Sequence, residues 1–314
     1  MESWKRLKIG NKLKLLIPLV LVFNVIVFVL ILSSATTENK DESLVDETEY
    51  TSVPIPDSVS FAGEKMPLSQ FDVKEALDRE LLSNAYFHSQ TIRYIKLAPR
   101  YFSIIEPILK EKGIPDDFKF LAVAESGFNP RAESPANAVG FWQFLKGTAQ
   151  DYGLEINSEI DERYHVEKST YAACDYLRDA YDLYGSWTMV AASYNSGMNG
   201  INRQIIRQKT ESYYDLLLVE ETQRYVYRIV ALKLILENPE VYNFKISNEE
   251  KYPLIKTKTI EVNSSIADFA DFAAENGLSY KLLKDFNPWL RENKLTNSGK
   301  KTYKIKIPIL NQEN

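Results

Sequence analysis

The sequence is poor in the residues that metal sites, disulfides and histidine-based catalysis require. It contains one cysteine, Cys174, and two histidines, His88 and His165. A single cysteine cannot form an internal disulfide, and neither a Cys/His cluster nor an HExxH motif for zinc is present. The histidines lie far apart, so a Ser-His-Asp site is poorly supported. We expect Cys174 to be a small buried hydrophobic residue and both histidines to have structural roles. No cofactor or metal is expected.

A basic excess is missing as well. The net charge is −5 and the isoelectric point is about 5.4, whereas a general nucleic-acid binder normally carries a positive surplus. No nucleic-acid partner is therefore expected. Hydrophobic residues make up 45% and charged residues 26% of the chain, which excludes wholesale disorder. The 314 residues leave room for about two domains.

One long apolar run occurs, "LLIPLVLVFNVIVFVLIL" at residues 15–32, and it carries no charge. The basic stretch 1–14 before it and the acidic residues after it predict a cytoplasmic N-terminus and a body outside the cytoplasmic membrane. The run is either an uncleaved transmembrane anchor or a signal peptide cut near Ser34 and Ala35. Its length favours the anchor, and the lack of a following cysteine excludes a bacterial lipoprotein.

The remaining chain divides by composition. Residues 33–69 are rich in Ser, Thr, Glu, Asp and Pro and predict a solvated polar linker. Residues 70–245 show helical periodicity and no convincing strands, which predicts a mainly α domain. We expect Gly113 to cap a helix that Pro99 and Pro107 kink or divide. Further helices are expected at about 115–125, 143–152, 166–184, 187–194, 198–209 and 221–237.

Glu125 interrupts an otherwise apolar helix face. On a helix over residues 115–126, Phe118, Leu121 and Glu125 share one side, and Gly127 is placed to cap the helix. Partial burial and the negative end of the helix dipole would both raise the pKa of this carboxyl group, as suits a general acid. From periodicity alone, the alternative is a glutamate at the helix end that turns into solvent or pairs with Arg131.

Four ordered blocks resemble one family. The stretch "ESGFNPRAESPANAVGFWQF" (125–144) resembles the signature of the soluble-lytic-transglycosylase domain, closest to the membrane-bound lytic transglycosylase D type. The segments "EIDERYHVEKSTYAACDYL" (159–177), "MVAASYNSGMNGI" (189–201) and "EETQRYVYRIVAL" (220–232) resemble its later blocks. The resemblance implies a lysozyme-like, goose-type helical fold for residues 70–245.

The resemblance also implies roles for individual residues. Glu125 matches the catalytic acid/base of the family, and Ser134 matches a serine that helps to position the N-acetyl group of the sugar. The other matches are to substrate-binding positions, namely Gln143, Tyr194, Asn195, Tyr225 and Phe141. Phe141 and Trp142 have a competing interpretation as core residues behind the groove. Tyr227 departs from the pattern, because many relatives carry proline there.

The implied reaction is cleavage of peptidoglycan glycan strands with formation of a 1,6-anhydro product. One glutamate would act first as acid and then as base. The other carboxylates near Glu125 in sequence are Asp116, Asp117 and Glu133, and Glu133 in particular stays open as a second catalytic group. Two alternatives remain, a non-catalytic, membrane-tethered peptidoglycan-binding protein and a goose-type lysozyme-like hydrolase. The expected location is the cell envelope, on the periplasmic side of the inner membrane.

The C-terminal region has a different pattern. "KTKTIEV" and "KTYKIKIPI" predict short strands on either side of two short amphipathic helices. The stretch "NGLSYKLLKDFNPWL" and the closing "YKIKIP" resemble a LysM domain, although Asn263 to Ile266 depart from the usual Gly-Asp-Thr-Leu opening. We therefore expect a divergent βααβ LysM-like module over residues 256–310, either binding glycan or serving as a packing or spacer module.

Overall fold

The computed structural model describes residues 51–309. The predicted basic N-terminus (1–14), the anchor or signal segment (15–32) and residues 33–50 of the predicted linker lie outside these residues. Over the described range, no helix combines the length and the apolar character that a membrane span requires.

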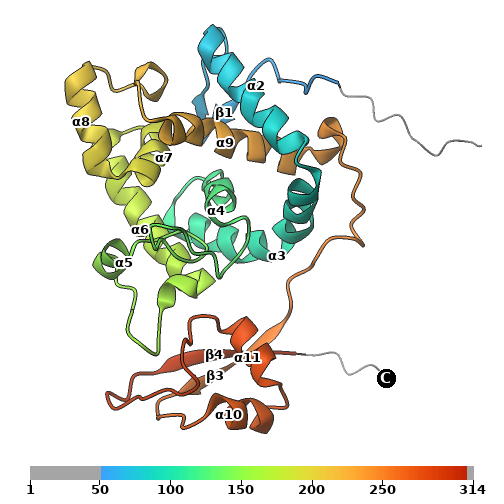
Figure 1. The fold of residues 1–314 in the computed structure, drawn as a ribbon, viewed down its shortest axis with the longest axis vertical. Coiled ribbons are helices and arrows are strands. Elements are labelled where there is room, and N and C mark those ends of the chain that lie inside the picture. Colours follow the sequence, from blue (N-terminus) through green and yellow to red (C-terminus); the bar gives the residue numbers. More distant parts are fainter. Residues whose placement is uncertain (1–50, 310–314) are drawn as a thin grey trace, which may run out of the picture. The chain divides into compact units, whose positions relative to one another are not determined.

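The described chain is mainly helical, which confirms the predicted fold class (Figure 1). The first part contains α2 (Phe71–Ala85), α3 (His88–Lys112), α4 (Phe118–Ser126), α5 (Lys146–Asp151), α6 (Val166–Tyr184), α7 (Trp187–Ser196), α8 (Met198–Gln208) and α9 (Glu220–Glu237). Three short 3₁₀ turns lie between or after them, at Glu162–Tyr164, Tyr213–Asp215 and Pro239–Tyr242. The predicted helices are all present, with ends shifted by up to three residues.

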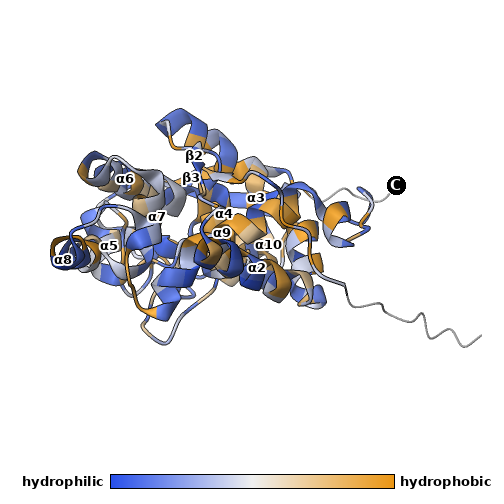
Figure 2. Cartoon of the chain, turned by 90° about the horizontal axis from the view of Figure 1, so that it is seen from above, coloured by the Kyte–Doolittle hydropathy of each residue, from blue (hydrophilic) through white to orange (hydrophobic). Residues whose placement is uncertain are grey.

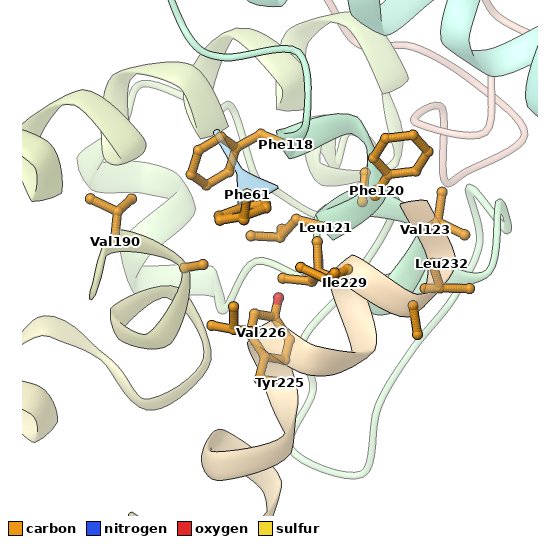
Figure 3. Close-up of a cluster of buried hydrophobic side chains, with 14 of the residues drawn as sticks. Phe61, Phe118, Phe120, Leu121, Val123, Val190, Tyr225, Val226, Ile229 and Leu232 are labelled. Atoms are coloured by element: carbon orange, nitrogen blue, oxygen red, sulfur yellow. The ribbon is translucent and has the colours of Figure 1, made fainter. Parts of the chain in front are cut away.

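Helix α4 lies at the centre of the helical core. Its residues from Phe118 to Val123 are all buried, and it packs against α3 and α9. Figure 2 shows α4 as a largely hydrophobic segment among mixed helices. Figure 3 shows Phe118 and Leu121 of α4 among apolar side chains of α9 such as Val226 and Ile229. A short helix fixed on this many sides is a rigid support for the residue at its end.

Helix α3 is a single helix of 25 residues. It runs unbroken through Pro99 and Pro107, so of the predicted kink or division, the division is wrong. Both prolines lie on the exposed face, where water can satisfy the carbonyl groups that lose a backbone partner. The helix ends at Gly113 with a φ of 68°, which confirms the predicted cap.

The end of the predicted linker is part of the core. Strands β1 (Ser60–Phe61) and β2 (Glu64–Lys65) form a small hairpin, and Val53, Val59, Phe61 and Met66 are buried in the main hydrophobic cluster. The assignment of residues 53–66 to a solvated linker is therefore wrong. Its polar composition hid a few well-spaced apolar side chains that cover α4, as Phe61 does against Phe118 at 5.2 Å between ring centroids.

The C-terminal region forms the predicted βααβ arrangement. Strand β3 (Thr257–Val262) pairs antiparallel with β4 (Tyr303–Pro308), with Thr257 opposite Pro308. Helices α10 (Phe269–Glu275) and α11 (Tyr280–Phe286) lie between the strands in sequence. The module has its own hydrophobic cluster, which includes Phe269 and Ile305. Val139, Ile160 and Tyr164 of the helical domain belong to the same cluster, so the two parts share a packed boundary.

Candidate active site

The side chain of Glu125 belongs to the last turn of α4. Gly127 follows with a φ of 55° and donates a backbone hydrogen bond to Val123, which confirms the predicted cap. A β-carbon at Gly127 would lie 2.8 Å from the Tyr94 hydroxyl oxygen, so close packing also requires glycine here. The helix thus ends abruptly and leaves Glu125 at the edge of the core.

The carboxyl group of Glu125 is turned into the protein, while the residue as a whole is half-buried. Its Oε1 atom accepts a hydrogen bond from the Tyr225 hydroxyl. Burial raises the pKa of the carboxyl group to about 7. The bond from Tyr225 and the charge of Arg228 lower this pKa, and the charge of Glu221 raises it. Such a group exchanges a proton near neutral pH.

Helix α9 presents different side chains to α2 and to α4. Arg224 and Arg228 lie one turn apart and meet Glu80 of α2, which is 1% exposed. The Nε atom of Arg224 is 2.5 Å from Glu80 Oε1, and the Nε atom of Arg228 is 3.7 Å from Oε2. Tyr225 points from the neighbouring face toward Glu125, and its hydroxyl is the polar group among the labelled side chains of Figure 3.

A cleft of about 680 Å³ opens beside Glu125. Its walls come from the start of α3 and the end of α4. Gln90 and Arg93 contribute polar atoms from α3, and Arg93 Nη1 donates to the Gly127 carbonyl at 2.8 Å. Sequence reasoning missed both residues, because nothing in the spacing of α3 distinguishes them from other exposed polar residues.

The loop between α4 and α5 (residues 127–145, called the α4–α5 loop) is folded by its own short-range hydrogen bonds. Ser134 Oγ accepts from the backbone N–H of Ala138 at 3.1 Å. Gln143 has a φ of 50°, and its Nε2 atom donates to the Gly140 carbonyl at 2.8 Å. Both predicted substrate-binding residues therefore hold the loop in shape, and neither bonds to Glu125.

A buried ion pair between Arg163 and Asp161 supports this loop. Arg163 Nη2 lies 2.7 Å from Asp161 Oδ2, with side-chain exposures of 9% and 10%. Arg163 Nη1 also donates to the carbonyls of Asn137 and Phe144, each at 3.2 Å. A β-carbon at Gly140 would lie 2.0 Å from the Arg163 carbonyl oxygen, so only glycine fits there. These contacts with Arg163 thus fix the position of the α4–α5 loop.

The predicted Tyr194 and Asn195 lie on α7. The Tyr194 hydroxyl donates to the Trp142 carbonyl at 2.7 Å. Burial, with a smaller contribution from the charge of Glu125, raises the pKa of Tyr194 well above its usual value, so the phenol stays protonated. Asn195 Oδ1 accepts from the Thr222 hydroxyl at 2.7 Å, which joins α7 to α9.

The aromatic residues before Gln143 belong to the core. Phe141 is 0% exposed and packs against Tyr101 at 5.0 Å between ring centroids. Its assignment as a substrate-contacting residue is therefore wrong, and the competing core interpretation is correct. Trp142 is likewise 0% exposed, and its Nε1 donates to Thr170 Oγ1 at 2.8 Å.

The carboxylates considered as partners of Glu125 have other roles. Asp116 pairs with Lys119 at 2.5 Å, and Asp117 Oδ2 pairs with Lys233 at 2.7 Å. Glu133 is exposed, and its backbone pairs with Val139. The carboxylate whose charge acts on Glu125 is Glu221, in the first turn of α9. Glu221 lies four residues before Tyr225 and therefore on the same face of α9. This spacing was the sequence signal that could have identified Glu221.

The remaining singled-out residues are structural in this fold. Cys174 is fully buried on α6, as expected. The His165 ring caps the start of α6 and lies 3.3 Å from Glu167. His88 begins α3 and lies near the ring of Phe244. Tyr227 is buried between Tyr213 and Tyr214 within an unbroken α9.

Comparison with known proteins gives a family match within each of the two domains. Residues 102–217 match the transglycosylase SLT domain, and residues 258–311 match the soluble lytic transglycosylase C-terminal LysM-like domain. The chain is 31% identical over 254 residues to membrane-bound lytic murein transglycosylase D of Escherichia coli K12. That alignment covers 78% of this chain and 55% of the relative, so the chain spans about half of the relative's length.

Solved structures of lytic transglycosylases show more distant similarity. The 70 kDa soluble enzyme of Escherichia coli has a TM-score of 0.39 and 20% identity, covering 49% of this chain and 27% of that one. An inactive variant of Slt from Pseudomonas aeruginosa has a TM-score of 0.37 and 17% identity, covering 48% of this chain and 26% of that one.

Proposed function

We propose that this chain, which combines a transglycosylase SLT domain with a LysM-like domain and is homologous to membrane-bound lytic murein transglycosylase D, is a peptidoglycan lytic transglycosylase. Its substrate is the bond between N-acetylmuramic acid and N-acetylglucosamine in glycan strands. The observation that supports this most directly is the buried carboxyl group of Glu125, whose pKa of about 7 suits a group that both gives and takes a proton.

In the proposed reaction, Glu125 first acts as the acid. Its carboxyl proton passes to the glycosidic oxygen, and the bond from that oxygen to C1 of the muramoyl sugar breaks. The acetamido oxygen of the same sugar stabilises the positive charge at C1. Glu125 is now a carboxylate, and the hydrogen bond from Tyr225 stabilises this form.

Glu125 then acts as the base. It removes the proton of the muramoyl 6-hydroxyl, and that oxygen attacks C1 to close a 1,6-anhydro ring. The proton returns to Glu125, so no water is consumed and no second carboxylate is needed. This fits a site where Asp116 and Asp117 are engaged elsewhere and Glu133 is exposed. Glu221 acts on Glu125 through its charge alone.

The other matched residues serve the same reaction in this proposal. Ser134 and Gln143 give the α4–α5 loop the shape of a groove wall, and Tyr194 and Asn195 form part of its floor. Tyr225 acts through Glu125. The LysM-like module contacts the wall polymer, and residues 15–32 hold the chain at the periplasmic face of the inner membrane or direct its export.

The products of peptidoglycan digestion test this proposal. Purified peptidoglycan is incubated with the full chain and with Glu125→Gln, and the soluble fragments are weighed by mass spectrometry. The expected result is anhydromuropeptides from the unchanged protein and none from the variant. Fragments heavier by one water would instead identify a hydrolase, and no fragments from either protein would indicate a binding protein. Anhydromuropeptides released by Glu125→Gln would refute the role of this residue.

A further inference from the structure

A second cavity, of about 800 Å³, lies where the LysM-like module meets the helical domain. Its walls come from α3, the α4–α5 loop, the start of α6, the segment before β3 and the end of α11. Ligand sites are common at such domain boundaries, and this volume suits a small molecule or a short peptide. None of the site residues assigned above to the reaction lines it.

Exposed apolar side chains gather at this cavity. Leu254, Ile255 and Ile309 all line it and are 48%, 38% and 51% exposed. The aromatic side chains of Tyr101 and Phe286 lie in the same wall. Single exposed apolar residues are common, but several around one cavity indicate a surface that binds an apolar group.

The cavity also carries positive charge that no carboxylate of the described residues pairs. Arg131 pairs with Asp285 at 3.0 Å, and Lys306 pairs with Glu167, so these four charges cancel. Arg100 and Lys256 line the cavity too, and no carboxylate within residues 51–309 lies within ion-pair distance of either. Arg100 instead donates to the Pro253 carbonyl at 3.1 Å, and its guanidinium lies 5.4 Å from the centre of the Tyr252 ring. The surplus positive charge favours a ligand that bears carboxylates.

The cavity adjoins the cleft of Glu125. Asn129 lines both of them. A group attached to a sugar at Glu125 would pass Asn129 to enter the second cavity. In peptidoglycan, the muramoyl sugar carries such a group, because its lactyl side chain bears a short peptide with apolar side chains and free carboxylates.

We propose that this cavity binds the peptide stem of the strand whose sugar is held at Glu125, with Arg100 and Lys256 facing the carboxylates of the stem. The inference rests on the proposed function for the position of the sugar. The cavity would then contribute to substrate choice, because glycan strands stripped of their peptides cannot occupy it.

The first experiment measures binding without catalysis. A free stem tetrapeptide is titrated by calorimetry into the full chain carrying Glu125→Gln, and then into the same protein with Lys256→Gln or Lys256→Glu. Lys256 is exposed and has no side-chain partner in the described residues, so these changes leave the fold intact, as thermal melting will verify. Binding should weaken about threefold with Lys256→Gln and further with Lys256→Glu.

Lys258→Gln is the matched control. Lys258 lies two residues along the chain, is exposed, and does not line the cavity. It should bind the tetrapeptide as the parent protein does. Equal weakening by Lys256→Gln and Lys258→Gln would overturn the site, as would the absence of tetrapeptide binding.

The second experiment measures substrate choice. The ratio of kcat/KM on stem-bearing strands to kcat/KM on amidase-stripped strands should exceed one, and should fall toward one in Arg100→Gln and Lys256→Gln. An unchanged ratio in both variants would contradict the proposal. If neither substrate were cleaved, the proposed function would fail, while the calorimetric titration would still decide peptide binding.

Discussion

Glu80 and Glu125 meet neighbouring faces of helix α9 and have different surroundings. Glu80 on α2 is 1% exposed and meets Arg224 and Arg228. Glu125 on α4 meets the hydroxyl of Tyr225, and its pKa is raised to about 7. Both carboxyl groups are held by helices that pack against the same neighbour, and the side chains of α9 determine the difference.

The contrast separates a structural carboxylate from a reactive one. A buried carboxylate with cationic partners links two helices. A buried carboxyl group whose hydrogen-bond donor is neutral keeps its proton up to a pH near neutrality and can then release it. The alternation of Arg224, Tyr225 and Arg228 along α9 therefore gives each glutamate a separate role. The predictions below test this division.

The largest effect is expected from Glu125→Gln, because an amide cannot transfer the proton. The rate of anhydromuropeptide release should fall about 10³-fold or more. The melting temperature should not fall, since no charged partner is lost. Glu133→Gln is the matched control from the adjacent loop and should retain activity. A comparable loss in that control would indicate two catalytic carboxylates.

Glu80→Gln should reduce the stability of the fold and leave the rate of the reaction unchanged. Removing the charge leaves Arg228 without a carboxylate partner and Arg224 with only the exposed Glu220, at an expected cost of roughly 2–4 kcal/mol in the free energy of unfolding. Chemical denaturation measures this cost. Arg79→Gln, which breaks the exposed pair with Glu220, should cost less than about 1 kcal/mol. Equal costs for the two variants would show that Glu80 is not a structural ion pair.

Glu125 should also make the stability of the fold depend on pH. The folded protein binds the proton of Glu125 more tightly than the unfolded chain does, because burial raises this pKa from 4.5 to about 7. Stability contributed by the protonated form is therefore present below pH 4.5 and is lost as pH rises to 7. Relative to the unchanged protein, Glu125→Gln should gain roughly 2–3 kcal/mol across this range.

Urea unfolding at several pH values from 4 to 8 measures that difference. The free energy of unfolding of both proteins is compared at each pH, so that titration of other groups cancels. A constant difference over the whole range would mean that Glu125 titrates as an ordinary exposed carboxyl group.

The smallest effects are shifts of the pH profile in opposite directions. Tyr225→Phe removes a hydrogen bond that lowers the pKa of Glu125, so the alkaline limb of kcat/KM should move to higher pH. Glu221→Gln removes a negative charge that raises this pKa, so the limb should move to lower pH. Rate measurements from pH 5 to 9 compare the two. Shifts in the same direction would contradict the assigned causes.

The sequence predicted the helices and Glu125 because both depend on local signals. Apolar spacing located α6 at residues 166–184 with its observed ends, and Gly127 marked the end of α4. Periodicity could place Glu125 on the buried face, but it could not supply Tyr225 or Arg228, which come from a helix about 100 residues later.

Long-range packing explains the predictions that failed. Phe141 was matched by motif to a glycan groove, yet its ring fills the core against Tyr101. Residues 53–66 were assigned to the linker from their polar composition, although Phe61 and Met66 cover the core. The cavity beside Lys256 combines segments that lie far apart in sequence, so no local pattern indicates it.

The most direct test of the account is the titration of Glu125 itself. Glutamate side chains are labelled with ¹³C at the carboxyl carbon, and the Glu125 signal is assigned by its loss in Glu125→Gln. The account predicts that this signal titrates with a pKa near 7, in the full chain and without substrate. A pKa near 4.5, the value for an ordinary glutamate, would contradict the claim that burial prepares this residue to transfer a proton.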